Sequence, residues 1–597
     1  MGEARKQLRL WPGVAAVILQ WFSQFVLPRI WADAGGLGVL GGVLCGLVVL
    51  VWWAFFSRAP RVERWGAIVP MVVAIAATPR FLHKSIAAGA MGMLFPILSI
   101  PVLCLVLVVW TAATRRLAAT PRRVILVAAI VVACAAFALI RTEGITARGQ
   151  SQFAWRWTPT TEQKTLARIA AAPPSPPAPV PVAAPVMEVP KEPKPRPTVP
   201  KTGTPPVVAQ AAAEWPGFRG PQRDGVVHGV QIKTDWSISP PVKLWHREVG
   251  PGWSSFAVGN GLIYTQEQRG DSEVVSCYKQ TTGEPLWTHR DATRFWESNA
   301  GAGPRATPIL SGDRVYTFGA TGILNSLNAS DGSVVWTRNA ASDTGAKVPM
   351  WGFTSSPLVV GDRLIVAMAG QLVAYDTASG ARRWLGPAHR DSYSSPQLLT
   401  INGISQIVLL SDAGATSVVP ADGKVLWEHP WPGLPILQPA VTGDGGVLLT
   451  TGSMGGGAGT RLVASAQGPG GWTAREVWTS KGLKPFFNDL VVHKGYAYGF
   501  DGSILACIDL KDGQRKWKGG RYGSGQLLLL ADQDVLLVLS EEGELALVAA
   551  VPGEFTEIAK VPAIEGKTWN HPALTGDTLL VRNGQEMAAF RLRLAGI

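Results

Sequence analysis

Tryptophan recurs at a regular interval through the C-terminal two thirds of the sequence. Each interval of about 40 to 50 residues holds three short stretches of alternating apolar residues, separated by turn sequences such as Gly-Asp-Arg. The strand-ending tryptophans are Trp245, Trp287, Trp336, Trp384, Trp427, Trp478 and Trp517. This pattern is typical of a β-propeller, in which each repeat forms one four-stranded blade. We expect these tryptophans to be structural and to pack one blade against the next.

A glycine stands four residues before five of these tryptophans, and a small residue stands ten residues before the same five. The glycines are Gly283, Gly332, Gly380, Gly423 and Gly513. We expect them in the tight turn between the third and fourth strands, where φ has to be positive. Cys277 and Cys507 occupy two of the small-residue positions, in different repeats. We therefore expect free thiols that pack in the core rather than a disulfide.

The repeats predict eight blades and the way in which the ring closes. Eight blocks of three strands follow one another, the first near Trp253 and the last within residues 570–594. No fourth strand follows the last block, whereas residues 242–247 form a strand that precedes the first block. Pairing of these two segments completes the eighth blade and leaves no long exposed edge.

Five apolar stretches precede the repeats. They cover residues 11–27, 35–56, 65–78, 86–113 and 124–140. Four of them approach or exceed the roughly 17 to 25 residues that a bilayer-spanning helix needs, and the third is shorter. We count all five as spans, because the loop cations then alternate between the two sides and no signal-peptide cleavage site follows the first stretch. The lipid bilayer is thus an expected partner of a five-span helical anchor.

The basic residues between the apolar stretches predict the orientation of the chain. Ten lysines and arginines fall on the side of the N-terminus, and three fall on the opposite side. Because cytoplasmic loops carry the excess of Lys and Arg, we expect a cytoplasmic N-terminus and an extracytoplasmic C-terminal part. In a bacterium with two membranes, the anchor would then lie in the inner membrane and the repeats in the periplasm.

A proline-rich segment separates the anchor from the repeats. Residues 171–206 contain fourteen prolines, which excludes a helix or sheet interior and favours an extended spacer. The expected organisation is an anchor in 1–145, a juxtamembrane segment in 146–170, a linker in 171–210 and the propeller in 211–597. The net charge of +13 resides in residues 1–170, and charges balance in the remainder. This balance excludes the basic surface that nucleic-acid binding requires.

The repeat resembles that of the quinoprotein-type propellers. Residues 374–384 and 507–517 are similar to the tryptophan-docking repeat of that family, and Trp215-Pro-Gly-Phe-Arg-Gly-Pro221 is similar to the initial segment of its bacterial PQQ-binding-like members. The resemblance implies an all-β, eight-bladed, quinoprotein-like propeller. The family includes alcohol and glucose dehydrogenases that use pyrroloquinoline quinone (PQQ), and the membrane-bound glucose enzyme also carries five N-terminal spans. Its non-enzymatic members include the propeller subunit of the outer-membrane β-barrel assembly machinery.

Candidate ligand-binding residues lie where the innermost strands begin around the central channel, because propellers bind ligands there. The candidates for cofactor binding are Arg305, Trp351, Asn488, Arg521, Trp569 and Asn570. Arginine pairs with carboxylates and tryptophan stacks on planar rings, so this set suits PQQ, which carries three carboxylates. Asp489 is the candidate catalytic base. Oxygen ligands for Ca²⁺ are offered by Glu297, Asn299, Asn488 and Asp489, although no spacing among them identifies a metal site.

Two functions follow from these features. In the first, the chain is a membrane-anchored scaffold of the cell envelope whose propeller binds a small ligand or another envelope protein. In the second, it is a PQQ-dependent dehydrogenase that oxidises an alcohol or sugar and reduces membrane quinone. The five-span layout and the channel residues favour the enzyme, whereas the short loops, the missing Cys-Cys pair and the undefined Ca²⁺ site favour binding. The channel residues also have a purely structural interpretation, and we favour the scaffold.

Overall fold

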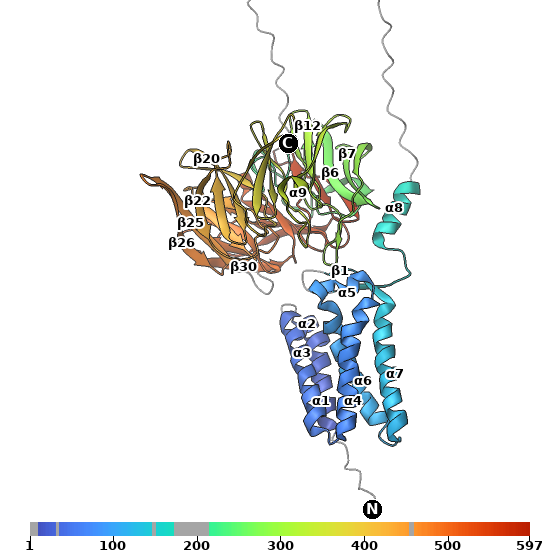
Figure 1. The fold of residues 1–597 in the computed structure, drawn as a ribbon. Coiled ribbons are helices and arrows are strands. Elements are labelled where there is room, and N and C mark those ends of the chain that lie inside the picture. Colours follow the sequence, from blue (N-terminus) through green and yellow to red (C-terminus); the bar gives the residue numbers. More distant parts are fainter. Residues whose placement is uncertain (1–9, 32–34, 146–150, 172–213, 453–458, 597) are drawn as a thin grey trace, which may run out of the picture.

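The computed structural model describes residues 10–31, 35–145, 151–171, 214–452 and 459–596 of the chain (Figure 1). These residues form a helical bundle and a propeller, and one end of the bundle faces the propeller. Between the two parts the chain forms the hairpin of β1 (Ile140–Ile145) and β2 (Ser151–Trp155) and the helix α8 (Thr161–Ala171). The predicted proline-rich linker of residues 171–210 lies, apart from its first residue, outside the described residues.

Five helical spans of the bundle are long and apolar enough to cross a membrane, as the sequence predicted. The first span, Trp11–Ile30, contains α1 (Trp11–Trp21) and α2 (Leu27–Ile30), and the second, Gly35–Phe56, contains α3 (Gly35–Val51). The third span, Arg61–Arg80, contains α4 (Arg61–Ala77). The fourth and fifth spans are the helices α6 (Leu94–Ala113) and α7 (Ala119–Ala138). The fourth span begins at Leu94 rather than at the predicted residue 86. Ala90 and Met91 adopt left-handed φ values of 47° and 57°, which interrupt the helix after the short α5 (Lys84–Ala87).

Small residues on α3 allow the first span to pack closely against it. The amide of Gln20 donates to the carbonyl of Gly42 at 2.9 Å, and the amide of Gln24 donates to the carbonyl of Ile97 on α6 at 2.7 Å. Because lipid offers no hydrogen-bond partners, these internal bonds help to fix how α1, α3 and α6 pack.

Eight antiparallel blades form the propeller, which confirms the predicted ring. Blades 1 to 3 are β5 (Ala257–Gly259), β6 (Leu262–Arg269), β7 (Ser272–Lys279) and β8 (Pro285–Asp291); β11 (Ile309–Ser311), β12 (Arg314–Phe318), β13 (Ile323–Asn328) and β14 (Val334–Asn339); and β15 (Leu358–Val360), β16 (Arg363–Met368), β17 (Gln371–Asp376) and β18 (Arg382–Leu385). Blades 4 to 6 are β19 (Gln397–Ile401), β20 (Ile404–Ser411), β21 (Gly414–Val418) and β22 (Val425–Pro430); β23 (Ala440–Val441), β24 (Val447–Thr451), β25 (Gly459–Gly468) and β26 (Gly471–Ser480); and β27 (Val491–His493), β28 (Tyr496–Asp501), β29 (Ile504–Asp509) and β30 (Arg515–Arg521).

The ring closes through pairing of strands from the two ends of the propeller. Blade 7 consists of β31 (Gln526–Leu530), β32 (Val535–Leu539), β33 (Glu544–Ala549) and β34 (Glu557–Pro562), and the short β3 (Val226–Val227) adds to β31 in parallel. Blade 8 consists of β35 (Ala573–Thr575), β36 (Thr578–Arg582), β37 (Glu586–Arg591) and β4 (Val242–Glu248). The antiparallel register of β4 with β37, with Trp245 opposite Ala589, confirms the predicted closure.

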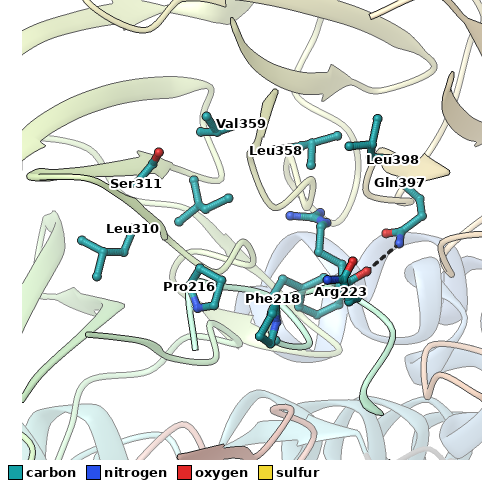
Figure 2. A pocket seen from close by; sticks show the side chains of 14 residues that line it. Pro216, Phe218, Arg223, Leu310, Ser311, Leu358, Val359, Gln397 and Leu398 are labelled. Carbon is teal, nitrogen blue, oxygen red and sulfur yellow. Dashed lines mark hydrogen bonds between the residues drawn. The ribbon is translucent and has the colours of Figure 1, made fainter. Parts of the chain in front are cut away.

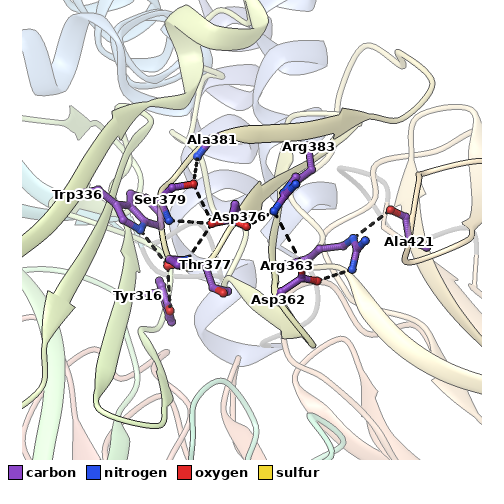
Figure 3. A network of polar contacts seen from close by, with 11 residues as sticks. Tyr316, Trp336, Asp362, Arg363, Asp376, Thr377, Ser379, Ala381, Arg383 and Ala421 are labelled. Carbon is purple, nitrogen blue, oxygen red and sulfur yellow. Dashed lines mark hydrogen bonds and ion pairs between the residues drawn. The ribbon is translucent and has the colours of Figure 1, made fainter.

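The repeated tryptophans join neighbouring blades, as Figure 3 shows for blades 2 and 3. The indole N–H of Trp336 donates to the carbonyl of Thr377 at 2.9 Å in the next blade. The turn that carries this carbonyl is held by Asp376, whose carboxylate accepts from the N–H of Ser379 at 2.8 Å and pairs with Arg383. Five other repeated tryptophans donate in the same way to the following blade, whereas Trp427 donates to Gln406 of its own blade.

The five predicted turn glycines all have positive φ, between 65° and 73°. The structure gives them a second role, because the tryptophan of the preceding blade lies against the α-carbon. A Cβ on Gly380 would stand 2.7 Å from the ring of Trp336. The predicted packing role of Cys277 and Cys507 is also confirmed, since both are free and fully buried.

The blade topology gives the propeller two distinct faces. The connections between blades and the turns between second and third strands share one face, which we call the proximal face. The other turns share the opposite, distal face. A hairpin in the connection from blade 1 to blade 2, formed by β9 (Trp296–Glu297) and β10 (Gly301–Ala302), meets the bundle, because Ser298 donates to the carbonyl of Ala88 at 2.9 Å. The proximal face is therefore the one that faces the bundle (Figure 1).

Polar contacts hold the proximal face to the membrane part of the chain. The ammonium of Lys84 on α5 lies 4.6 Å from the ring of Trp296. The guanidinium of Arg294 donates two hydrogen bonds to the carboxylate of Glu162 on α8, at 2.7 and 2.8 Å. Such partly exposed pairs each contribute little free energy, so the attachment depends on several weak contacts together.

Candidate functional site

Six aromatic side chains meet at the proximal mouth of the central channel. They come from five connections between blades and form one series of ring contacts, with centroids 4.7 to 6.4 Å apart. In order, the series is Trp253, Trp569, Phe487, Phe486, Trp351 and Tyr393. The structure thus brings the two predicted stacking residues, Trp351 and Trp569, to the same mouth, where other rings already pack against each of them.

Arg305 lies at this mouth, and all of its nitrogens have partners within the protein. Its guanidinium donates to the carbonyls of Gly301 at 2.9 Å and Gly303 at 3.0 Å, and to those of Ala302 and Trp351 at 3.3 Å. Its remaining contact is an ion pair with Glu297 at 3.3 Å. Burial lowers the pKa of Arg305 to about 10, an effect that Glu297 opposes. The carboxylate of Glu297 also accepts from the N–H groups of Asn299 and Ala300.

Asp489 is buried below the mouth between a cation and a histidine. Its Oδ2 lies 3.4 Å from Nε of Arg219 and 3.3 Å from Nε2 of His571. Burial lowers the pKa of His571, although Asp489 acts in the opposite direction. The neutral imidazole packs edge-on against Phe218. Asp489 is therefore the counter-ion of a buried arginine, Arg219.

The two predicted asparagines hold backbone segments in place. The Oδ1 of Asn488 accepts from the N–H of Phe486 at 3.0 Å. The amide of Asn570 donates to the carbonyls of Ser254 at 2.7 Å and Gly252 at 3.2 Å. Arg521 is the last residue of the outermost strand of blade 6, where it is exposed and donates to Ser503 at 3.1 Å. The structure thus brings Arg305, Trp351, Asn488, Trp569 and Asn570 to the channel, and it leaves Arg521 outside the channel.

Lys567 is a functional candidate that the sequence reasoning missed. Its ammonium lies 4.2 Å from the ring centroid of Trp569 and 5.1 Å from that of Trp253, and it donates to the carbonyl of Asn299 at 3.1 Å. Burial lowers its pKa to about 8, against the opposing effect of Glu297. A Cβ on Gly144 of β1 would stand 3.0 Å from this ammonium, so the membrane-side hairpin covers the lysine. The position of Lys567 two residues before Trp569 was the only available signal in the sequence.

The segment of residues 215–225, which we call the channel segment, threads the ring on the distal side of the aromatic cluster. Trp215 pairs with Val258 of blade 1, and the carbonyl of Pro216 accepts from Leu310 of blade 2. Arg223 donates to the carbonyls of Ser356 at 3.1 Å and Pro357 at 2.7 Å in blade 3. The same segment also bonds to Gln397, Gln438, Leu490 and Leu529 of blades 4 to 7. One short segment therefore ties blades 1 to 7 together from inside.

A pocket of about 260 Å³ lies between the channel segment and the inner strands of blades 2, 3 and 4 (Figure 2). Its wall includes Leu310, Leu358 and Leu398 together with the ring of Phe218. It extends to Ser311, the last residue of the inner strand of blade 2, and thus toward the distal face. Its volume is below the roughly 300 to 1,000 Å³ of sites for drug-sized molecules, so it suits a small group or one end of a chain.

The channel mouth does not fit PQQ. A planar cofactor that stacks between two rings needs them about 7 Å apart, twice the contact distance of two carbon atoms, whereas Trp253 and Trp569 lie 4.9 Å apart. The donors of Arg305 already serve four carbonyls and Glu297, which leaves none for the carboxylates of the cofactor. Among the described residues, no group of three or more His, Cys, Asp or Glu side chains is arranged to hold a metal ion. The two rings therefore leave no gap for a stacked planar cofactor, and Arg305 leaves no free donor for its carboxylates.

Sequence similarity to curated proteins supports the propeller repeat. One curated relative is outer membrane protein assembly factor BamB of Shewanella oneidensis, which is 26% identical over 197 residues that cover 31% of this chain and 45% of the relative. Another is BamB of Yersinia pestis, which is 27% identical over 153 residues that cover 24% of this chain and 36% of the relative. The alignments thus span less than half the length of these relatives.

Two solved structures are similar to part of the chain at low identity. BamB from Moraxella catarrhalis is 14% identical with a TM-score of 0.43, and the similarity covers 59% of this chain and 98% of that chain. The quinohemoprotein alcohol dehydrogenase from Comamonas testosteroni is 13% identical with a TM-score of 0.44, and the similarity covers 64% of this chain and 81% of that chain. The model of the family described as outer membrane protein assembly factor BamB matches residues 270–518 and 411–595. Because these matches together span more than half of the chain, the chain belongs to that family.

Proposed function

We propose that this chain is a membrane-anchored scaffold of the bacterial cell envelope whose propeller binds another envelope protein. One observation carries this proposal: Arg305, the cation expected to hold a ligand at the channel mouth, bonds through every nitrogen of its guanidinium to groups of the fold itself. Arg305 bonds to neighbouring carbonyls, Asp489 pairs with Arg219, and Asn570 holds the backbone of blade 1. These three side chains are thus engaged in holding the fold, which supports a function carried by the outer surfaces of the propeller.

The placement in the inner membrane is part of the same proposal. The five candidate spans of the described residues are odd in number, which supports an N-terminus and a propeller on opposite sides of the bilayer. The excess of loop cations on the side of the N-terminus supports a cytoplasmic N-terminus and a periplasmic propeller. The curated relatives are outer membrane protein assembly factors by name, which supports an envelope protein as the class of partner.

The distal face is the surface that we assign to the partner. The proximal face lies against the bundle, whereas the distal face points away from it and holds the pocket beside the channel segment. Ser311 and Leu398 are half-buried residues of this pocket and lie on two different blades. A partner bound at this pocket would contact Ser311 and Leu398 at the same time.

Site-specific photo-crosslinking in cells tests this assignment. A photoreactive residue replaces Ser311 in one variant and Leu398 in a second, and the matched control carries it at the exposed Ser342 on the proximal face. We expect both distal variants to crosslink the same envelope protein, identified by mass spectrometry, and the control to give no such product. Different proteins at the two distal positions, or the same protein at all three, would contradict a defined distal binding surface.

A further inference from the structure

The connection between blades 2 and 3 presents apolar side chains to the outside on the proximal face. Val348 is 45% exposed and Met350 is 58% exposed, and the neighbouring Lys347 is exposed as well. These exposures hold with the helical bundle in place, so the bundle covers neither apolar side chain. Neighbouring apolar side chains that protrude together on one surface loop indicate a contact with another apolar phase.

The loop that carries these residues is held in a defined shape. The N–H of Gly352 donates to the carbonyl of Pro349 at 2.9 Å, which closes a tight turn with Met350 at its first corner. The following Trp351 is anchored at the channel mouth by ring contact with Tyr393 at 4.7 Å. Its carbonyl also accepts from Arg305. The turn is therefore a rigid projection, and Met350 lies at its tip.

The orientation of the propeller points this projection toward the membrane. Every connection between blades shares the proximal face, and the connection from blade 1 to blade 2 rests on the bundle through Ser298 and Ala88. Ala88 lies between α4 and α6, at the end of the spans that faces the propeller. Exposed aromatic residues at the same end, Phe81 and Trp155, are of the kind that occupies the membrane–water interface. The loop that projects from the proximal face thus lies on the side of this interface.

Among the described residues, Val348 and Met350 stay exposed on the proximal face, which is the face that the bundle contacts through Ser298 and Ala88. Valine and methionine side chains suit the boundary between headgroups and acyl chains, and a lysine beside them suits lipid phosphates. We propose that residues 347–350 are a lipid-contacting projection that rests on the membrane in which the bundle is embedded.

This contact gives the propeller a second attachment to the membrane, apart from its docking on the bundle. Two separated attachments fix the tilt of a rigid ring, whereas the bundle contacts alone are few and polar. The proposal does not depend on the proposed scaffold function, because it concerns only how the propeller is held.

Spin labelling of the full chain in nanodiscs tests the projection. In a variant without the five native cysteines, Met350→Cys carries the label, and the matched control is Val441→Cys, a 38% exposed valine on an inner strand near the distal face. Nanodiscs contain phosphatidylcholine with a minority of phosphatidylglycerol. We expect a several-fold higher ratio of oxygen to nickel-chelate accessibility at position 350 than at position 441, and loss of the difference in amphipol, where no bilayer is present.

Two results would overturn the proposal. Equal ratios at positions 350 and 441 in nanodiscs would show that the projection stays in water. A protected position 350 that is unchanged in amphipol would show contact with protein instead of lipid. If the cysteine-free chain does not fold, a photoreactive residue replaces Met350 in the otherwise native chain. A crosslink to lipid would then support the projection, whereas crosslinks to protein without any to lipid would contradict it.

Discussion

Replacement of Gly380 by alanine tests the link between the turn glycines and the tryptophans of the preceding blade. Gly380 has a φ of 68°, which costs a residue with a side chain about 1 kcal/mol or more. The added Cβ would also stand 2.7 Å from the ring of Trp336. This ring cannot move away freely, because its N–H is bonded to Thr377. Overpacking of this kind adds roughly 1 to 3 kcal/mol. We expect Gly380→Ala to lower the free energy of unfolding by about 3 kcal/mol.

Gly361 supplies the matched control within the same blade. Its φ is 59°, and an added Cβ would meet no atom within 4 Å. Gly361→Ala therefore has the backbone strain without the clash, and it should cost about 1 kcal/mol. Both variants are measured in the full chain in detergent, by urea titration followed through tryptophan fluorescence, with equal m-values as the criterion for comparison. Equal losses in the two variants would refute the role of the tryptophan and leave only the positive φ.

Three further predictions concern the blades. Trp336→Phe removes the indole donor and leaves the Thr377 carbonyl only the hydroxyl of Tyr316 at 3.3 Å, so we expect a loss of about 1 kcal/mol in the same urea titration, and an unchanged midpoint would contradict the docking bond. Deletion of residues 242–248 removes the outer strand of blade 8, and we expect the sharp urea transition of the propeller to broaden, whereas a transition as steep as that of the intact chain would argue against closure through this strand. Burial raises the pKa of Glu273 from 4.5 to about 7, so the folded state prefers its protonated form; this preference is fully present below pH 4.5 and is lost as the pH rises through about 7. Stability should therefore fall over that interval and fall less steeply in Glu273→Gln, and identical pH profiles of the two proteins would exclude this group as the source.

The sequence was sufficient to predict the propeller because its signals are local. The glycine four residues before a tryptophan indicates a turn that five of the blades share, and alternating apolar residues indicate the strands. The unpaired strand before the first block could only be completed by the last block, which made the closure through β4 predictable. The fourth span was predicted to begin at residue 86 but begins at Leu94. The apolar residues around Ala90 and Met91 do not indicate the left-handed turn that ends the preceding helix.

The candidate site was only partly predictable, because it is made by contacts between distant parts of the chain. Arg305 could be predicted at the channel because it lies just before an inner strand. Its partner Glu297 lies in the hairpin of β9 and β10, which is not part of the repeat. Arg521 was expected at the channel, yet it pairs with Ile504 because β30 continues past Trp517. The motif that begins at Trp215 marked the family, and only the structure shows that it threads the ring and bonds to blades 1 to 7.

The most direct test of the central claim is a titration of the purified full chain with PQQ in the presence of Ca²⁺. Retained cofactor is followed by its absorbance after gel filtration, and turnover is followed by dye reduction with a panel of alcohols and sugars. Because the rings at the mouth pack on one another and Arg305 is fully bonded, we predict no stoichiometric retention and no turnover. Retention of one PQQ per chain with turnover, lost in Arg305→Ala or Asp489→Asn variants that still unfold cooperatively, would contradict the scaffold account and establish a dehydrogenase.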